Sequence, residues 1–397
     1  MFIPYLFGDS DSRAYFCCLT NYKVKIVESY IESKLQERIN NHSLRKLSNN
    51  HTLSDFCSND YLGFAKSETL REAILKKASE YDLPLAGATG SRLISGNHLF
   101  TEELENEISA FHDAESGLIF NSGYDANLGI FSSLPQRGDT IICDELIHAS
   151  IIDGTRLSFA NRYTFKHNDI DSLEEKLKTA KGRIYIAIES IYSMDGDEAP
   201  LEAIVNLAEK YDAAVIVDEA HATGIFGDKG RGLVHQYNLQ QRIFARVITF
   251  SKALGCHGAI VLSNKNLRSY LVNFARSFIY TTAASPLSHI SVAMAYSHLK
   301  TNDFQKDIAA KISFFRQTLN LPNHCLISSN SPIQCLIVGG NERTRALAQR
   351  IRNKGMDVRA ILHPTVPEGK ERLRICLHTF NSDIEIEQLA TALKENL

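Results

Sequence analysis

Short apolar runs alternate with amphipathic segments through the middle of this chain. Six runs of strand length, rich in Ile and Val, lie at residues 117–120, 140–143, 184–188, 213–217, 247–250 and 259–262. They do not alternate with polar residues, which is typical of strands buried on both faces of a parallel sheet. Helical patterns separate them, such as 200–211 with Pro200 near its start. The pattern therefore predicts an α/β fold with a mostly parallel central sheet.

The N-terminal part follows a different pattern. Residues 1–23 show no period, and we expect an N-terminal extension there. From 24 to 39 apolar residues recur every three or four positions, which predicts an amphipathic helix. We interpret 24–60 as a helix and strand segment that packs beside the C-terminal domain. Further on, Thr101 is expected to cap a helix that carries Leu104, Ile108 and Phe111 on one face.

The C-terminal hundred residues predict a smaller α+β domain. A helix at 343–353 is closed by Gly355, and strands follow at 358–361 and 373–377. Ser382 and Glu385 form a capping-box pattern that opens a last helix. The expected division is a large domain over 61–289 and a small domain over 290–397.

Composition and charge exclude several classes of protein. The 43 Lys and Arg against 46 Asp and Glu give a net charge of −3, without the basic stripe typical of nucleic-acid binders. No apolar stretch approaches the ~18 residues of a membrane span, and the first residues lack the basic region of a signal peptide. The eight cysteines form no C-x-x-C pair, which favours reduced thiols and a cytoplasmic location over disulfides or a metal site.

The first candidate site residues stand after the run at 213–217. Asp218 ends this apolar strand, and His221 follows three residues later. In open α/β sheets ligands bind beyond the carboxyl ends of the strands, so both side chains are expected at the site. The alternative is an Asp that caps the next turn and a His whose hydrogen bonds are local.

Lys252 stands just beyond the next strand, at 247–250. A lysine in such a place is often a solvated charge. A lysine that forms a Schiff base must instead lose its proton, and partial burial favours the loss of the proton. An acid for a pyridinium nitrogen together with a Schiff-base lysine is the pair that pyridoxal 5′-phosphate (PLP) requires. Asp218 and Lys252 at two strand ends of one sheet therefore point to PLP.

Seven motifs in order support this interpretation. They are NDYLG at 59–63, GSRLISG at 90–96, NSGY at 121–124, SMDG at 193–196, DEAH at 218–221, TFSK at 249–252 and PTVP at 364–367. With them the chain, from about residue 25 to 397, resembles the α-oxoamine synthases, a family of fold-type I PLP enzymes. The resemblance implies a PLP-dependent aminotransferase-like fold.

The resemblance also implies roles for single residues. Lys252 would hold PLP covalently and move protons at the substrate's α-carbon. Asp218 would pair with the pyridinium nitrogen of the cofactor. His221 would contact its phenolic oxygen, and His148 would stack on its ring. Further cofactor contacts would come from Gly123, Tyr124, Ser193, Thr249, Thr281 and Thr282. Gly123 and Tyr124 open a helix whose N–H groups suit a phosphate. Thr281 and Thr282 would reach the cofactor of the neighbouring subunit in a homodimer. For the hydroxyl residues, a role in a turn or cap is the alternative.

Substrate contacts follow from the same resemblance. Arg374 is similar to the arginine that binds the amino-acid carboxylate, and a planar guanidinium suits that task. Thr365 would line the acyl pocket. Arg45 matches a position that helps to bind the acyl substrate, with a solvated surface arginine as the alternative. No metal site is expected.

The family joins an amino acid to an acyl thioester with loss of CO2. The runs at 253–259 and 374–378 are most similar to the branch of biotin synthesis, which uses L-alanine and a pimeloyl thioester of coenzyme A or acyl carrier protein. Glycine with an acetyl donor and serine with a palmitoyl donor are the alternatives within the family. Outside it, a non-catalytic scaffold subunit would typically lack Lys252. A nicotinamide dehydrogenase would need a G-x-G-x-x-G loop, which the glycines of 224–232 do not form.

Overall fold

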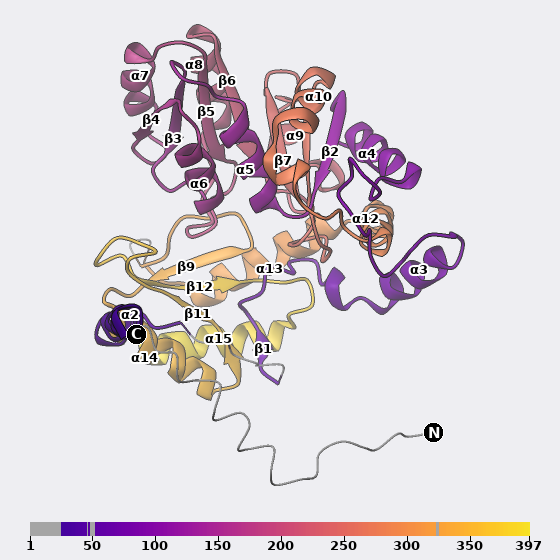
Figure 1. Cartoon of the computed structure of the whole chain (residues 1–397). Coiled ribbons are helices and arrows are strands. Elements are labelled where there is room, and N and C mark those ends of the chain that lie inside the picture. The colour runs from indigo at the N-terminus through magenta and orange to yellow at the C-terminus, as the bar shows by residue number, and fades with distance from the viewer. Residues whose placement is uncertain (1–24, 46, 48–51, 323–324) are drawn as a thin grey trace.

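The computed structural model describes residues 25–45, 47, 52–322 and 325–397. Its largest sheet has seven strands, in the order β2 (Ser116–Phe120), β8 (Ala259–Ser263), β7 (Ala245–Thr249), β6 (Ala213–Asp218), β5 (Ile184–Glu189), β3 (Thr140–Asp144) and β4 (Asn161–Phe165). The strands from β7 to β4 are parallel, and β8 is antiparallel to both of its neighbours. The predicted α/β fold with a mostly parallel central sheet is confirmed, and all six predicted strands are present (Figure 1).

Two hydrophobic layers explain why these strands carry uninterrupted apolar runs. Successive residues of one strand point to opposite faces, so Ile141 packs with the layer under α5 (Gly123–Ser133) and α6 (Ala149–Leu157), whereas Ile142 packs with the layer on the other face. That second layer holds α4 (Leu99–Phe111), α8 (Leu201–Lys210) and α12 (Pro286–Leu299). Because helices cover both faces, neither set of strand residues can be polar.

Two predictions differ from the structure for physical reasons. β4 was missed because it is the edge strand, and its first four residues are exposed and carry no apolar run. The expected cap at Thr101 is wrong, since α4 begins at Leu99 and His98 is the residue before it. Thr101 lies buried within the helix, where its Oγ1 is 2.9 Å from Nδ1 of His289 on α12. The hydroxyl of Thr101 therefore contacts a neighbouring helix and does not cap its own.

A smaller antiparallel sheet carries the C-terminal part. Its order is β11 (Arg359–Ile361), β12 (Arg372–Cys376) and β9 (Ile333–Ile337), with α13 (Phe304–Leu319), α14 (Asn341–Asn353) and α15 (Asp383–Asn396) beside it. Ser382 and Glu385 form the predicted capping box at the start of α15. In Figure 1 this part lies below the seven-stranded sheet. The proposed limits of the two domains, at 61–289 and 290–397, stay a prediction.

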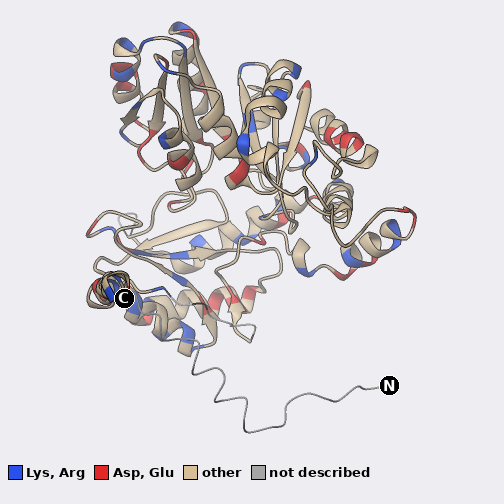
Figure 2. Ribbon diagram, in the orientation of Figure 1, with Lys and Arg blue, Asp and Glu red and all other residues tan. Residues whose placement is uncertain are grey.

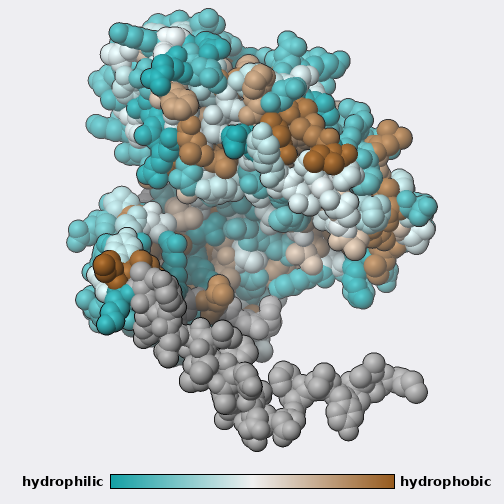
Figure 3. Space-filling view, in the orientation of Figure 1, coloured by the Kyte–Doolittle hydropathy of each residue, from teal (hydrophilic) through white to brown (hydrophobic). Residues whose placement is uncertain are grey.

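The described part of the N-terminal segment contacts the small sheet's helices. β1 (Ser54–Asp55) pairs in parallel with β10 (Met356–Asp357). The predicted amphipathic helix is α2 (Lys25–Asn40), and Asn341 and Arg345 of α14 donate to the carbonyl oxygens of residues just after it. None of the α2 residues is buried, and apolar side chains of this helix are visible at the surface (Figure 3). The extension expected at 1–23 lies outside the described residues.

The remaining elements complete the chain. They are the short helices η1 (Phe64–Lys66), η2 (Asp228–Gly230), α9 (Leu233–Gln236) and α11 (Arg276–Ile279), and the longer α3 (Glu68–Ala78), α7 (Ile170–Thr179) and α10 (Lys265–Phe274). Positive and negative side chains mix over the helices, without a face of one sign in the view of Figure 2. Among the helices that the structure describes, none has the length and apolar character needed to cross a membrane.

Candidate active site

The carboxyl ends of the parallel strands bring the predicted site residues together. Asp218 ends β6, Lys252 follows β7, and His148 follows β3. Burial lowers the pKa of Lys252 to about 8, although the carboxylates of Asp218 and Glu189 both favour the charged amine. A lysine with such a pKa carries a neutral amine in an appreciable fraction of molecules near neutral pH, as a nucleophile or base requires.

Asp218 is held in one orientation by two donors. Its Oδ2 accepts a hydrogen bond of 2.7 Å from Nδ2 of Asn127, and its Oδ1 accepts one of 2.9 Å from the N–H of Ala220. Asn127 lies on the buried face of α5 and also donates to Oγ of Ser150 at 3.0 Å. The carboxylate is therefore a fixed, buried acceptor. Asn127 was not predicted, and its only signal was a polar residue on an otherwise apolar helix face.

His221 is neutral and has one ring nitrogen engaged. Its Nδ1 lies 2.7 Å from the hydroxyl of Tyr61, which is also 3.1 Å from Oδ1 of Asn59. Burial, together with the positive charge of Lys252, lowers the pKa of His221 well below its usual value. Nε2 is thus the ring nitrogen left for a ligand. Tyr61 and Asn59 stand in the NDYLG motif, but the motif by itself did not indicate this contact.

His148 is fixed by the start of α6. Its Nδ1 accepts a hydrogen bond of 3.2 Å from the N–H of Ser150 and lies 2.7 Å from the hydroxyl of that residue. Burial lowers the pKa of His148, which is in the field of both Asp218 and Lys252. The imidazole is neutral, and because its edge is bound, its ring plane cannot rotate freely.

A helix N-terminus lies beside these groups and is shaped for an anion. At the start of α5, Ser122 accepts from the N–H groups of Asp125 and Ala126, and among the described residues those of Gly123 and Tyr124 have no acceptor. A Cβ on Gly123 would stand 2.5 Å from Cγ2 of Thr249. The Thr249 hydroxyl is buried with no hydrogen-bond partner in the described part of the chain. Free N–H groups, a close glycine and an unpaired hydroxyl fit a phosphate group.

The other predicted residues of this end lie nearby. Asn121 donates through Nδ2 to Oγ1 of Thr281 at 3.1 Å and to the carbonyl oxygen of Thr282 at 2.7 Å. The exposed side chain of Tyr124 instead donates its hydroxyl to Asp153 of α6. Both threonines therefore lie beside the loop that leads into α5.

Arg374 reaches the site from the small sheet. On β12 it is buried, and its Nε donates to the carbonyl oxygen of Ser193 at 2.8 Å. Its Nη2 donates to Oδ1 of Asn59 at 3.1 Å, and Nη1 lies 3.0 Å from Sγ of Cys376. Arg374 therefore presents a fixed positive charge opposite the strand ends of the large sheet.

Arg45 and Thr365, which are 320 positions apart, lie together. Nη2 of Arg45 is 3.4 Å from Oγ1 of Thr365. Both line a groove of about 1360 Å³ between the end of α2 and the small sheet, and Met194 lies in the same lining. Since Met194 is the neighbour of Ser193, the groove extends up to the Arg374 end of the site.

A further acid, which the sequence pattern was not taken to predict, lies at the same strand ends. Glu189 ends β5 beside Asp218, and its Oε2 accepts from the N–H of Ser193 at 3.2 Å. Burial, with the negative charge of Asp218, raises the pKa of Glu189 to about 8. The signal that could have revealed it is the one used for Asp218, namely an apolar strand that ends in an acid.

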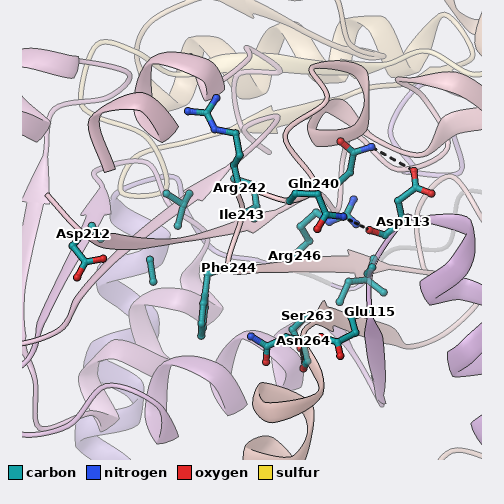
Figure 4. Close-up of a pocket in the computed structure, with 16 residues that line it drawn as sticks. Asp113, Glu115, Asp212, Gln240, Arg242, Ile243, Phe244, Arg246, Ser263 and Asn264 are labelled. Atoms are coloured by element: carbon teal, nitrogen blue, oxygen red, sulfur yellow. Dashed lines mark hydrogen bonds between the residues drawn. The ribbon is translucent and has the colours of Figure 1, made fainter. Parts of the chain in front are cut away.

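A second cavity lies at the opposite edge of the large sheet. Figure 4 shows its lining, which includes Asp113 and Glu115 before β2, Asp212 before β6, and Ser263 and Asn264 at the end of β8. Its volume is about 460 Å³. None of the predicted site residues lines it. The carboxyl edge of the sheet is therefore the candidate active site.

Comparisons with known proteins relate the chain to one family. Residues 52–393 match the model of the family "Aminotransferase class I and II". A curated 8-amino-7-oxononanoate synthase of Emericella nidulans is 43% identical over 394 residues, covering 92% of this chain and 94% of the relative. A crystal structure of 8-amino-7-oxononanoate synthase from Francisella tularensis is 28% identical with a TM-score of 0.73, covering 87% of this chain and 98% of that one. A structure of SPT with a PLP internal aldimine has a TM-score of 0.84 at 24% identity, covering 94% of this chain and 98% of that one. At this identity the similarity supports the fold alone.

Proposed function

This chain belongs to the aminotransferase class I and II family, and from that premise we propose that it condenses L-alanine with a pimeloyl thioester, with loss of CO2, to form 8-amino-7-oxononanoate. The resemblance to fold-type I PLP enzymes expected from the motifs is confirmed. The enzyme is a PLP-dependent acyltransferase, and the reaction belongs to biotin biosynthesis.

The observation that carries this proposal is the Lys252–Asp218 pair at adjacent strand ends. PLP requires an amine for its aldehyde, an acid for its ring nitrogen and an anion site for its phosphate. Lys252, Asp218 and the start of α5 beside Thr249 offer these three partners at one edge of the sheet. When bound, PLP supplies an electron sink that stabilises negative charge at the α-carbon of the attached amino acid.

The chain's own residues direct the proton transfers. Lys252 would hold the cofactor through Nζ, and its neutral amine would remove the proton from the α-carbon of the amino acid. Its lowered pKa makes it a base near neutral pH. Asp218, held by Asn127, would keep a proton on the ring nitrogen by accepting a charge-assisted hydrogen bond. His221 would offer its free Nε2 to the phenolic oxygen, and His148 would pack on the ring face.

The two substrates occupy different sides of Lys252 in this proposal. Arg374 binds the carboxylate of the amino acid, and Ser193 lies next to that arginine. The acyl thioester lies in the groove of Arg45 and Thr365. The α-carbon, after giving its proton to Lys252, would attack the thioester carbonyl, and the carrier would leave as a thiolate. The carboxylate at Arg374 would then be lost as CO2, and Lys252 would return a proton to the α-carbon. Orientation of both substrates is the main contribution of the protein.

A direct comparison of substrates tests the function. CO2 release is measured with L-alanine and a pimeloyl thioester, on both coenzyme A and acyl carrier protein, against glycine with acetyl-CoA and serine with palmitoyl-CoA. We expect the first pair to give the highest kcat/KM. A preference for either other pair would assign the chain to a different branch of the same chemistry, and no CO2 from any pair by the PLP-loaded protein would reject the proposal.

We also propose a homodimer in which each site is completed by the partner. Thr281 and Thr282 would contact the partner's cofactor phosphate through their hydroxyls. Large apolar side chains near this segment support an interface, because Leu93, Ile94 and Tyr280 are 52%, 85% and 73% exposed. A cytoplasmic location is part of the proposal, and the six cysteines among the described residues are free thiols, as expected there.

A further inference from the structure

The turn at 192–197 is held from the small-domain side by several side chains. It follows β5 and carries Ser193 and Met194. Arg374 donates to the carbonyl oxygen of Ser193 at 2.8 Å, and Arg372 contacts the carboxylate of Asp195. The hydroxyls of Ser329 and Ser331 donate to the carbonyl oxygen of Gly196 at 2.7 and 2.9 Å. The turn thus connects the carboxyl edge of the large sheet with β12.

A histidine after β4 contacts the same turn from the large sheet. His167 follows β4, and its Nδ1 lies 2.9 and 3.1 Å from the two carboxylate oxygens of Asp144, the last residue of β3. Its Nε2 lies 2.7 Å from Oδ2 of Asp197 in the turn. The neighbouring Asn168 adds a hydrogen bond of 2.9 Å to the same oxygen. His167 is therefore the bridge between the end of β3 and the turn.

The partners of His167 define its protonation state. An ionised carboxylate only accepts hydrogen bonds, so an imidazole between two of them must donate from both nitrogens and carry a positive charge. Although burial opposes the charge, the two carboxylates raise the pKa of His167 to about 9. The charged or titratable groups around it are Asp144 on β3, Glu145 after it, Tyr192, Asp195 and Asp197 in the turn, and Arg372 on β12.

We interpret these groups as a cluster of paired charges and not as a metal site. Ligand atoms of His167, Asp195 and Asp197 lie within 4.8 Å of one another. However, both nitrogens of His167 face carboxylates, and Asp195 is paired with Arg372. The positive charge that a cation would bring is already supplied by two side chains.

We propose that His167 is a positioning residue for the amino-acid site. As an imidazolium between Asp144 and Asp197, it fixes the 192–197 turn on the large sheet. The fixed 192–197 turn presents the Ser193 carbonyl oxygen to Nε of Arg374. This hydrogen bond sets the direction of the guanidinium towards the substrate carboxylate. The assignment of Arg374 to that carboxylate rests on the function proposed above, whereas the fixation of the turn does not.

Amide hydrogen exchange tests the fixation without any reaction. Within the turn, Tyr192 donates its N–H to the carbonyl oxygen of Asp197 at 3.0 Å, and Gly196 donates to that of Tyr192 at 2.8 Å. We expect His167→Gln to lower the protection of these amides by about tenfold or more, because a charge-assisted bridge is lost. The matched control is His235→Gln, since His235 faces Arg231 and Asp113 instead. Unchanged protection in His167→Gln would overturn the proposal.

The pH dependence gives a second readout that needs no variant. His167 has a raised pKa in the folded protein, so its contribution is complete below its unfolded pKa of about 6.5 and is lost as the pH rises through about 9. Protection of the turn should therefore fall above pH ~9 in the unmodified protein, and Asp197→Asn should move this fall to lower pH. Protection that is flat through this range would contradict a charged bridge.

Steady-state kinetics then test the link to the substrate. With His167→Gln we expect the KM for the amino acid to rise by about five- to tenfold, with a smaller change in kcat, in the KM for the thioester and in PLP retention. Equal changes in both KM values would reject the link to Arg374. If the unmodified protein releases no CO2 from any substrate pair, the proposed function fails, while the exchange experiment still decides whether His167 fixes the turn.

Discussion

At the scale of single residues, Lys252 is the group whose removal should be least tolerated by the reaction. We expect Lys252→Ala to abolish turnover and the visible absorption of a lysine-bound cofactor while the fold is kept, because no other residue among the described strand ends offers an amine beside Asp218. CO2 release and circular dichroism measure the two effects. Lys265→Ala at the exposed start of α10 is the control and should change neither. More than trace activity in Lys252→Ala would mean that another lysine holds the cofactor.

A second residue-scale prediction concerns Asp218. We expect Asp218→Asn to lower kcat on the order of 10²-fold or more, because a neutral amide cannot keep the ring nitrogen protonated. The loss in PLP binding should be smaller, roughly 1.5–3 kcal/mol for one charge-assisted hydrogen bond, since the phosphate contacts remain. Dialysis against buffer and single-turnover rates separate the two effects. Asp212→Asn, at the other end of the same strand, is the matched control, and a normal rate in Asp218→Asn would contradict the role.

At the scale of elements, the contact between the start of α5 and the end of β7 shapes the phosphate site. Only a residue without Cβ fits at Gly123, because a Cβ would stand 2.5 Å from Cγ2 of the buried Thr249. We expect Gly123→Ala to push the helix start away from β7 and to raise the dissociation constant for PLP by about tenfold or more. Gly87→Ala is the control, since nothing lies within 4 Å of a Cβ there. Equal PLP affinity in the two variants would show that the close approach is not needed.

At the scale of the whole molecule, the shared site of the proposed homodimer can be tested by complementation. We expect the double variant Thr281→Ala and Thr282→Ala to retain PLP poorly and to be inactive, as Lys252→Ala is. Mixing the two variants should restore up to about one quarter of the normal activity, if subunits pair at random and each mixed dimer has one intact site. Sedimentation and CO2 release measure assembly and rescue.

The outcomes of this mixing experiment are distinct. Rescue requires that one chain supplies Lys252 and the other supplies the two hydroxyls. An active monomer in sedimentation would reject the dimer. Mixed dimers without rescue would assign Thr281 and Thr282 to the site of their own chain, where Asn121 already contacts them.

The sequence by itself determined the layers of this protein and the ends of its strands. Strands buried on both faces must be apolar throughout, so the six runs were visible without a structure, whereas the exposed edge strand β4 was not. Asp218 and Lys252 were visible for a related reason, because a polar residue directly after an apolar run marks the edge where parallel strands end.

Only the tertiary structure decided which distant residues meet. Arg45 and Thr365, Tyr61 and His221, and Asn127 and Asp218 are each separated by at least 91 positions, and their contacts depend on how whole elements pack. The same holds for His167, whose charge follows from two carboxylates on different segments. A local pattern indicates whether a side chain faces a core or solvent. A hydrogen bond, however, depends on the positions of two atoms to within a fraction of an ångström. The packing of the complete chain sets those positions.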